Sequence, residues 1–294
     1  ARTMFTADAD GSALIHKGIA YTPRSRTFIP ARLEDNPDLM RTGYAATLEA
    51  MREPLRSMLR FGDMRACRQD DRWQLVPTRW AHEAQKRWVS RNGNFGVLQT
   101  LGVDVALGGS DQTIVATRHG ERSPERGSTI GRLVKRKGKD TPDGQSVVAL
   151  LMGTSWGEEG AVINIDAIGI GKSAVDVAKA CGLKGVHPVV VSNSSPWLDP
   201  RFPQMKFLNT RAAMMWRVRS LLDPEGGPPE TRLALPPDPE LLADLTAPRY
   251  CMKAGGLAVE SKEDIRERIG RSTDCGDAVA LACWQVGGMN ILRF

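Results

Sequence analysis

Residues 101–116 read LGVDVALGGSDQTIVA, and this stretch predicts the centre of the fold. An apolar run carries Asp104 in its middle, a Gly-Gly-Ser turn reverses the chain, and a second β-branched run follows. The pattern is typical of a β-hairpin with a carboxylate on its first strand. Because a carboxylate within an apolar strand costs free energy unless a positive charge meets it, Asp104 needs a partner.

Two later segments supply further carboxylates rather than a base. The apolar run VINID ends in Asp166, and the phrase STDCGD contains Asp274 and Asp277. Asp104 and Asp166, on adjacent strands, are expected at one edge of the sheet, where ligands of open α/β sheets bind. Asp274 and Asp277 are three residues apart on a helix, so both can face that edge. Carboxylates that converge from distant segments predict a site for Mg²⁺ or Mn²⁺, and two such ions can drive phosphodiester hydrolysis.

Each of these acids also has a purely structural explanation. Asp104 and Asp166 can be strand-end carboxylates satisfied by backbone donors. Asp274 suits a helix start, which favours negative charge, and Asp111 in the hairpin turn is interpreted as a turn former. We favour Asp277 as a direct metal ligand, with Asp274 as a second ligand or an orienting residue.

The composition indicates a soluble, globular chain of 294 residues, 41% hydrophobic and 25% charged. No apolar run reaches the length of a membrane span, and the first residues lack the features of a signal peptide. The five cysteines form no CxxC pair, which argues against a disulfide framework or a zinc site and fits a reducing cytoplasm. The net charge of +6 favours an anionic partner such as nucleic acid, although an ordinary soluble domain also carries such a charge.

The spacing of apolar residues predicts the other elements. Helical spacing occupies residues 38–59, split at Pro54, and residues 79–89. After the hairpin we expect strands at 145–152, 161–166 and 186–191, and helices at 168–181, 204–222 and 239–245. A hairpin at 249–259, a helix capped by Ser261 and a last helix capped by Ser272 follow. This order predicts an α/β fold with a mixed sheet and helices on both faces.

Basic side chains are concentrated in residues 118–144, a run that can grip phosphates as an arm or be a solvated loop. The candidates for DNA contact are Arg132, Lys135, Arg136, Lys137 and, from another segment, Lys172. Lys172 belongs to the phrase GIGKS, which ends like a phosphate-binding loop. The full pattern requires Gly where this chain has Asp166, so nucleotide binding by that route is not expected.

Taken in order, these motifs resemble the large terminase subunits of tailed bacteriophages and prophages, in their C-terminal nuclease domain. Residues 102–111 resemble the first hairpin of that nuclease, residues 166–171 its second acidic motif, and residues 261–278 its third. Residues 26–37, together with Gly43 and Tyr44, resemble the closing segment of the family's ATPase half. The resemblance implies an RNase H-like fold and two parts. Residues 1–70 would be a residual segment of the ATPase half with a helical linker, and residues 71–294 the nuclease domain.

The resemblance also implies a function. It implies a metal-dependent endonuclease that cuts concatemeric viral double-stranded DNA during genome packaging. The reaction would use two Mg²⁺ or Mn²⁺ ions, and Asp104, Asp166 and Asp277 would take the three catalytic positions. The implied partners are DNA, the small terminase subunit and the portal protein, in the cytoplasm of the bacterial host and away from membranes. Thr273 departs from the Pro of many relatives, which should leave the helix start intact. The ATP-binding loop of a complete terminase is missing, so ATPase activity is not expected from this chain.

Two other functions fit the same residues. A non-catalytic module that docks DNA or a portal-like partner would bind no Mg²⁺ or Mn²⁺ through these carboxylates. Another RNase H-like nuclease, such as a resolvase or transposase, would prefer branched or end-specific DNA.

Overall fold

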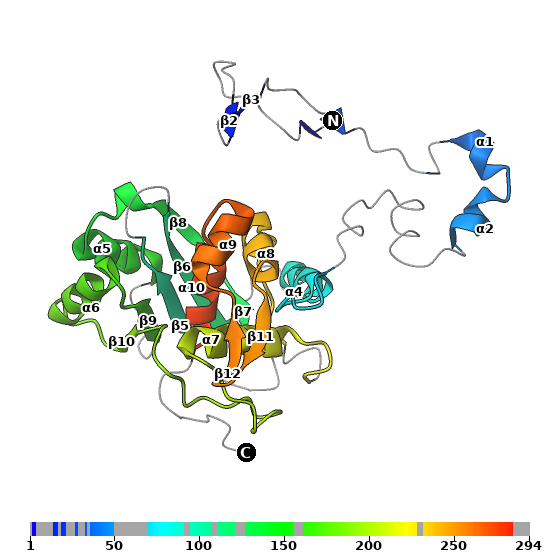
Figure 1. The fold of residues 1–294 in the computed structure, drawn as a ribbon. Coiled ribbons are helices and arrows are strands. Elements are labelled where there is room, and N and C mark those ends of the chain that lie inside the picture. The colour runs from blue at the N-terminus through cyan, green and yellow to red at the C-terminus, as the bar shows by residue number, and fades with distance from the viewer. Residues whose placement is uncertain are drawn as a thin grey trace. The chain divides into compact units, whose positions relative to one another are not determined.

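A computed structural model gives the structure of the chain (Figure 1). It describes residues 2–3, 14–16, 19–21, 27–28, 33, 36–49, 70–90, 95–106, 111–120, 127–155, 161–227 and 232–284. The chain divides into two compact units, Ala1–Asp70 and Asp71–Phe294. All of the side chains predicted for the site belong to the second unit.

The first unit contains short elements. β1 (Arg2–Thr3) pairs with β4 (Thr27–Phe28), and β2 (Leu14–His16) pairs with β3 (Ile19–Tyr21), both antiparallel. The helices α1 (Pro37–Met40) and α2 (Tyr44–Glu49) follow. The helical prediction for residues 38–59 is therefore confirmed as far as Glu49, with a break at residues 41–43. The remainder of that segment, including Pro54, lies outside the described residues.

A mixed sheet forms the centre of the second unit. Its strands in the described part of the chain are β5 (Val97–Asp104), β6 (Gln112–Gly120), β7 (Thr129–Ile130), β8 (Val134–Lys137), β9 (Val162–Asp166) and β10 (Val186–Val189). The order is β10-β9-β5-β6-β7, and β8 also pairs with β6. β5 runs antiparallel to β6, with Asp104 opposite Ile114, and parallel to β9. The antiparallel pairing of the predicted hairpin is confirmed, and so is the mixed sheet, whereas the Gly-Gly-Ser turn lies outside the described residues.

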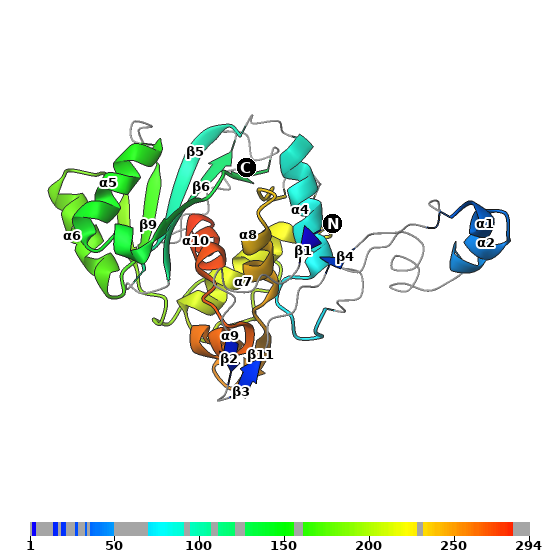
Figure 2. The same cartoon turned by 90° about the horizontal axis from the view of Figure 1, so that it is seen from above.

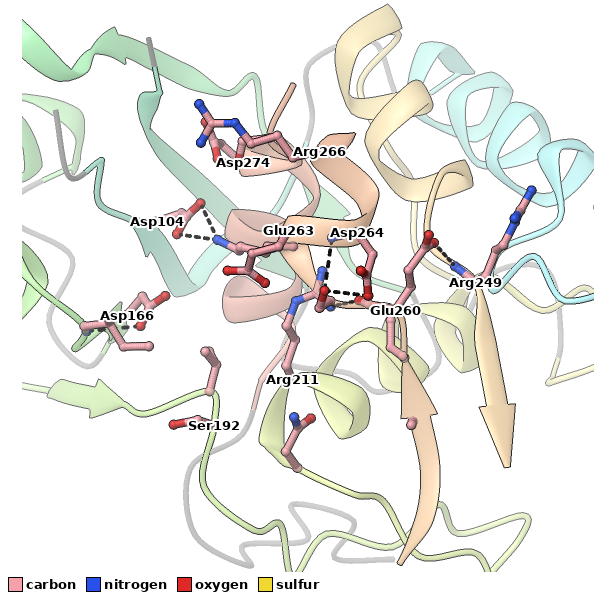
Figure 3. Close-up of a pocket in the computed structure, with 18 of the residues that line it drawn as sticks. Asp104, Asp166, Ser192, Arg211, Arg249, Glu260, Glu263, Asp264, Arg266 and Asp274 are labelled. Atoms are coloured by element: carbon pink, nitrogen blue, oxygen red, sulfur yellow. Dashed lines mark hydrogen bonds and ion pairs between the residues drawn. The ribbon is translucent and has the colours of Figure 1, made fainter. Parts of the chain in front are cut away.

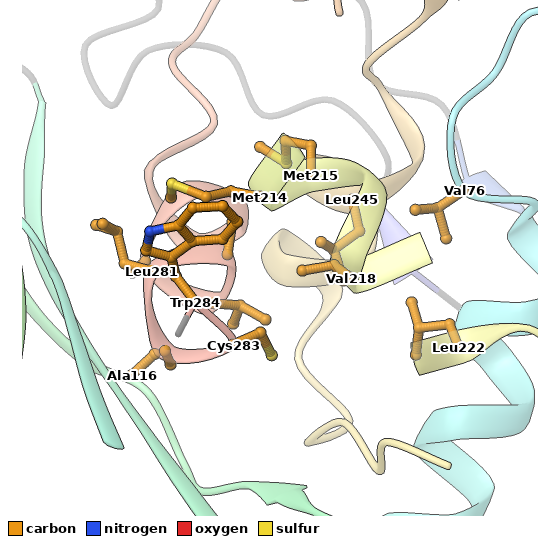
Figure 4. Close-up of a cluster of buried hydrophobic side chains, with 14 of the residues drawn as sticks. Val76, Ala116, Met214, Met215, Val218, Leu222, Leu245, Leu281, Cys283 and Trp284 are labelled. Carbon is orange, nitrogen blue, oxygen red and sulfur yellow. The ribbon is translucent and has the colours of Figure 1, made fainter. Parts of the chain in front are cut away.

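Helices cover both faces of this sheet (Figure 2). One face is covered by α5 (Gly144–Ser155) and α6 (Ile170–Ala180), which pack against the apolar side chains of β5 and β9. On the other face lies α10 (Asp274–Ala282), backed by α4 (Thr78–Ser90), α7 (Thr210–Leu222) and α8 (Pro239–Thr246). Figure 4 shows the resulting core, which contains Leu281 and Trp284 together with Met214 and Met215. The α/β class with helices on both faces of the sheet is thus confirmed.

The α10 helix is fixed directly on the two central strands. A methyl group added to Gly102 on β5 would overlap the backbone of Ala278 and Ala282 on α10, so only glycine permits this close approach. On β9, the buried amide of Asn164 donates to the carbonyls of Leu281 at 2.8 Å and Trp284 at 2.9 Å. The helix that carries Asp274 and Asp277 is therefore held at a set position on the sheet.

The strand predicted at residues 145–152 is wrong, because these residues belong to the helix α5. The run QSVVALLM is apolar enough to suit a buried strand or a buried helix. Asp143 and Ser146 decide between them: Ser146 N donates to Asp143 Oδ1 at 2.8 Å, and Asp143 N donates to Ser146 Oγ at 3.2 Å. This reciprocal pair begins a helix in the manner of a capping box.

The last elements lie close to their predicted places. They are the hairpin β11 (Tyr250–Lys253) and β12 (Gly256–Val259), and the helix α9 (Lys262–Ile269). Ser261 caps α9 as predicted, accepting from Asp264 N at 3.1 Å. Ser272 does not cap α10, because its hydroxyl donates to the carboxylate of Asp274 instead.

In the part of the chain that the structure describes, no helix is both long and apolar enough to cross a membrane.

Candidate active site

The alternation of side chains along two parallel strands brings Asp104 and Asp166 to one edge of the sheet. β5 and β9 are paired as far as Val103 and Ile165, so the next residue of each strand ends it at the same edge. Successive side chains of a strand point to opposite faces, which puts Asp104 on the face of Gly102, toward α10. Both carboxylates are buried, with exposed fractions of 5% and 8%.

The third carboxylate, Asp277, comes from α10 and shares a cation with Asp104. Lys262 Nζ lies 3.1 Å from Asp277 Oδ2 and 3.4 Å from both carboxylate oxygens of Asp104. A second cation, Arg211 at the start of α7, places its Nε 3.4 Å from Asp277 Oδ1. Two acids from distant segments therefore meet at one ammonium group.

The pKa values of these three acids are shifted in different directions. Burial raises the pKa of Asp104 above its usual range, because the Lys262 charge only partly offsets the loss of water and the neighbouring carboxylates. Burial also raises the pKa of Asp166. Burial acts in the same sense on Asp277, but the charges of Lys262 and Arg211 hold the pKa of Asp277 below its usual value. A cation at this site therefore favours the charged form of each neighbouring carboxylate.

Asp274 stands apart from the lysine. Its Oδ2 accepts from Gln112 N at 3.0 Å, and its Oδ1 accepts from the hydroxyl of Ser272. Burial raises the pKa of Asp274. Since both oxygens already have donors, the geometry suits an orienting role that ties α10 to the start of β6. Asp111, interpreted as a turn former, forms an ion pair of 3.5 Å with Arg266.

A cavity of about 940 Å³ opens over these groups. Asp104, Asp166 and Asp274 line it at one end, and Arg249 lies at the other, as Figure 3 shows. Asp277 is not among the lining residues, whereas its partner Lys262 is. Asp104, Asp166 and Asp274 are thus reached through one cavity.

The predicted DNA contacts lie elsewhere on the surface. None of the five lines the cavity. Lys172, Arg132, Arg136 and Lys137 are exposed, and Arg132 stacks over the ring of Trp88 at 5.9 Å. Lys135 differs, because its Nζ is 2.8 Å from Asp238 and 2.7 Å from Glu240. Its charge is therefore already compensated within the protein.

The donor set of the site suits a hard divalent ion. Within the described residues, no three acidic, histidine or cysteine side chains form a ready-made metal site. Lys262 Nζ occupies the point on which Asp104 and Asp277 converge. The groups around that point are carboxylate oxygens, which Mg²⁺ and Mn²⁺ prefer as ligands. The ammonium of Lys262 is a cation at the same point. The residues present therefore fit such an ion, once the lysine withdraws.

Comparisons with known proteins bear on the fold. No family model and no curated protein matches the sequence. The structure is similar to the nuclease domain of the large terminase subunit gp2 of bacterial virus Sf6, with a TM-score of 0.54 and 17% identity over 73% of this chain and 100% of that one. The chain has the fold of a large terminase nuclease domain. A mutant of the same Sf6 domain, with manganese and beta-thujaplicinol, gives a TM-score of 0.56 at 16% identity, again over 73% of this chain and 100% of that one.

Two residues of this terminase nuclease fold escaped the sequence interpretation, which singled out neither Lys262 nor Arg211. Lys262 had a usable signal, because it is the first residue of a helix, where a positive charge is unfavourable. A lysine at that position suggests a nearby acid. Arg211 had no such signal, since its contact with Asp277 joins α7 to α10 across 66 residues of sequence only in the folded state.

Proposed function

We propose that this chain is the nuclease part of a phage or prophage large terminase, which cuts concatemeric viral double-stranded DNA during genome packaging. The observation that carries the proposal is the meeting of Asp104 and Asp277 at one cation position, with Asp166 at the same edge of the sheet, in a fold like that of terminase nucleases. The ordered acidic motifs of the sequence support the same function.

The cofactors would be two Mg²⁺ or Mn²⁺ ions. Asp104, Asp166 and Asp277 would hold them, with Asp274 as a further ligand or an orienting group. When bound, such ions activate a water and stabilise the leaving oxygen of a phosphodiester. In support, a mutant of the nuclease domain of Sf6 gp2 is known with manganese.

Lys262 would act as the exchangeable counter-ion of the site. In the absence of a divalent ion, it compensates Asp104 and Asp277, which are both buried. Its side chain is 30% exposed and ends a flexible stem, so the ammonium can withdraw toward the cavity. There it adds positive charge where a DNA phosphate would approach.

Contacts to the DNA backbone would come from the exposed basic side chains. Lys172, Arg132, Arg136 and Lys137 are the proposed contacts, and compensation by two acids makes Lys135 a weaker one. Such contacts position the duplex without reading its sequence. Residues 1–70 would be a residual segment of the ATPase half with a helical linker. The small terminase subunit, the portal protein and the cytoplasm of the bacterial host complete the proposed setting.

Cleavage of plasmid DNA tests the proposal. Asp104→Asn and Asp166→Asn should each abolish Mn²⁺-dependent cleavage, while circular dichroism and thermal unfolding remain those of a folded chain. The matched control is Asp176→Asn, because Asp176 is an exposed acid on α6 away from the cavity and its loss should leave cleavage unchanged. Full activity in both site variants would reject the proposed function.

The lysine between the acids gives one reason to keep the docking module as a second candidate, since a non-catalytic site would need a permanent counter-ion. Titration with Mn²⁺ separates the two, because a docking module binds no ion that depends on Asp104. A resolvase or transposase is separated by comparing linear, circular and four-way DNA as substrates.

A further inference from the structure

The carboxylate of Asp277 is bracketed by two cationic side chains, one on each oxygen. Arg211 Nε lies 3.4 Å from Oδ1, and Lys262 Nζ lies 3.1 Å from Oδ2. Thr273 adds a hydrogen bond from its hydroxyl to Oδ2, at 3.1 Å. The two oxygens of this buried acid are therefore not equivalent.

The two cations are held in different ways. Arg211 is in the first turn of α7, where its backbone N–H donates to the carbonyl of Val191 at 2.9 Å. Its guanidinium also donates from Nη1 to the carbonyl of Glu260 at 2.6 Å (Figure 3). The side chain of Arg211 is 10% exposed. Lys262 is 30% exposed, and its Nζ forms ion pairs with the carboxylates of Asp104 and Asp277. Arg211 is the fixed partner of Asp277, and Lys262 is the exchangeable one.

We propose that Arg211 is a positioning residue that holds Oδ1 of Asp277, so that Oδ2 alone faces the point now filled by Lys262 Nζ. A divalent ion at that point would meet one oxygen of Asp277 in a set orientation. The inference rests on the proposed function, because it concerns the same ion. It assigns Arg211 no contact with the ion or with DNA.

The shape of the guanidinium explains why arginine suits this role. Its planar fork carries donors in fixed directions, and here Nε lies 3.4 Å from Asp277 Oδ1 while Nη1 donates to the carbonyl of Glu260. A lysine has a compact ammonium on a flexible stem and cannot keep both partners in the same geometry. Arg211→Lys therefore preserves the charge and removes the two-point hold, which separates positioning from simple charge compensation.

The experiment measures Mn²⁺ binding by calorimetry or electron paramagnetic resonance, without DNA. Groups that orient metal ligands typically contribute about 10–100-fold to metal affinity, so Arg211→Lys should weaken binding about 10-fold. Arg219→Lys is the matched control, because Arg219 is on the same helix and bonds the carbonyl of Leu75 without touching the carboxylates. Its Mn²⁺ affinity should equal that of the wild type. Wild-type affinity in Arg211→Lys would overturn the proposal.

A second measurement covers the case in which the substitution disturbs the fold. Arg211→Lys is added to Asp277→Asn, and each protein is compared by thermal unfolding without metal. If Arg211 acts through Asp277, the added substitution leaves the residual Mn²⁺ affinity of Asp277→Asn unchanged. An equal loss of affinity on both backgrounds means a general structural effect and overturns the proposal. If the wild type binds no Mn²⁺, the proposed function fails together with this inference, whereas unaffected binding in Arg211→Lys rejects the role of Arg211 alone.

Discussion

Replacing Lys262 with methionine removes the charge between two buried acids while keeping most of the side-chain volume. Nζ lies 3.1 Å from Asp277 and 3.4 Å from Asp104. Removing one partner of a buried ion pair costs about 3–5 kcal/mol, because the other charge stays buried and uncompensated. Since Lys262 is itself 30% exposed and partly screened by water, we expect the lower end, about 3 kcal/mol. For a unit of this size, that loss corresponds to a fall in Tm of about 6–12 °C.

Divalent ions should reverse this loss. In Lys262→Met an ion no longer has to displace an ammonium, so Mn²⁺ should bind more tightly than in the wild type. An ion at a hundred times its Kd adds about 2.7 kcal/mol to the free energy of unfolding. Scanning calorimetry with EDTA and then with Mn²⁺ measures both effects on the same protein.

The matched control for this variant is Lys86→Met. Lys86 forms an ion pair of 2.8 Å with Glu83, but its side chain is 73% exposed, so the free energy of unfolding should change by less than about 0.5 kcal/mol. If Lys262→Met is as stable as the wild type in EDTA, or if Mn²⁺ fails to stabilise it, Lys262 is not the counter-ion of the site.

Two further predictions concern the mounting of α10. Gly102→Ala should lower the free energy of unfolding in urea by about 3 kcal/mol, because the new methyl group overlaps the backbone of α10. Gly153→Ala, on the open surface of α5, should be neutral or stabilising by up to about 1 kcal/mol. Equal effects of the two substitutions would refute the close approach. Asp244→Ala should lower the free energy of unfolding by about 1–2 kcal/mol through the loss of a helix cap, since Asp244 Oδ2 accepts from Cys275 N at 3.0 Å and Gly276 N at 3.3 Å. The substitution should also weaken Mn²⁺ binding. Unchanged stability would show that α10 does not depend on the Asp244 cap.

The local patterns that could be read from sequence are those whose cause lies within a few residues. The pairing of the two strands in residues 101–116 follows from an apolar run, turn residues and a β-branched run, and the start of α9 follows from Ser261 and Asp264. The strand prediction for residues 145–152 was wrong because these apolar residues suit a strand or a helix. The deciding contact is the hydrogen bond from Ser146 N to Asp143 Oδ1, between residues three apart in sequence. Here a local signal existed and the apolar run outweighed it.

The start of α10 shows a cause that no local pattern contains. Ser272 is a good capping residue by type, yet its hydroxyl bonds Asp274. The first N–H groups of the helix are accepted by Asp244, which is 31 residues away from Cys275 along the chain. A cap supplied by another helix depends on how α8 packs against α10, which is a property of the tertiary structure.

The sequence by itself determined the acids of the candidate site and the strands and helix that carry them, because periodicity and turn residues act over short distances. It also indicated that Asp104 and Asp166 would share a sheet edge. Only the tertiary structure decided which cations meet those acids: Lys262 between Asp104 and Asp277, and Arg211 behind Asp277. Charges interact through space rather than along the chain, and the energy of each contact depends on burial that only packing creates.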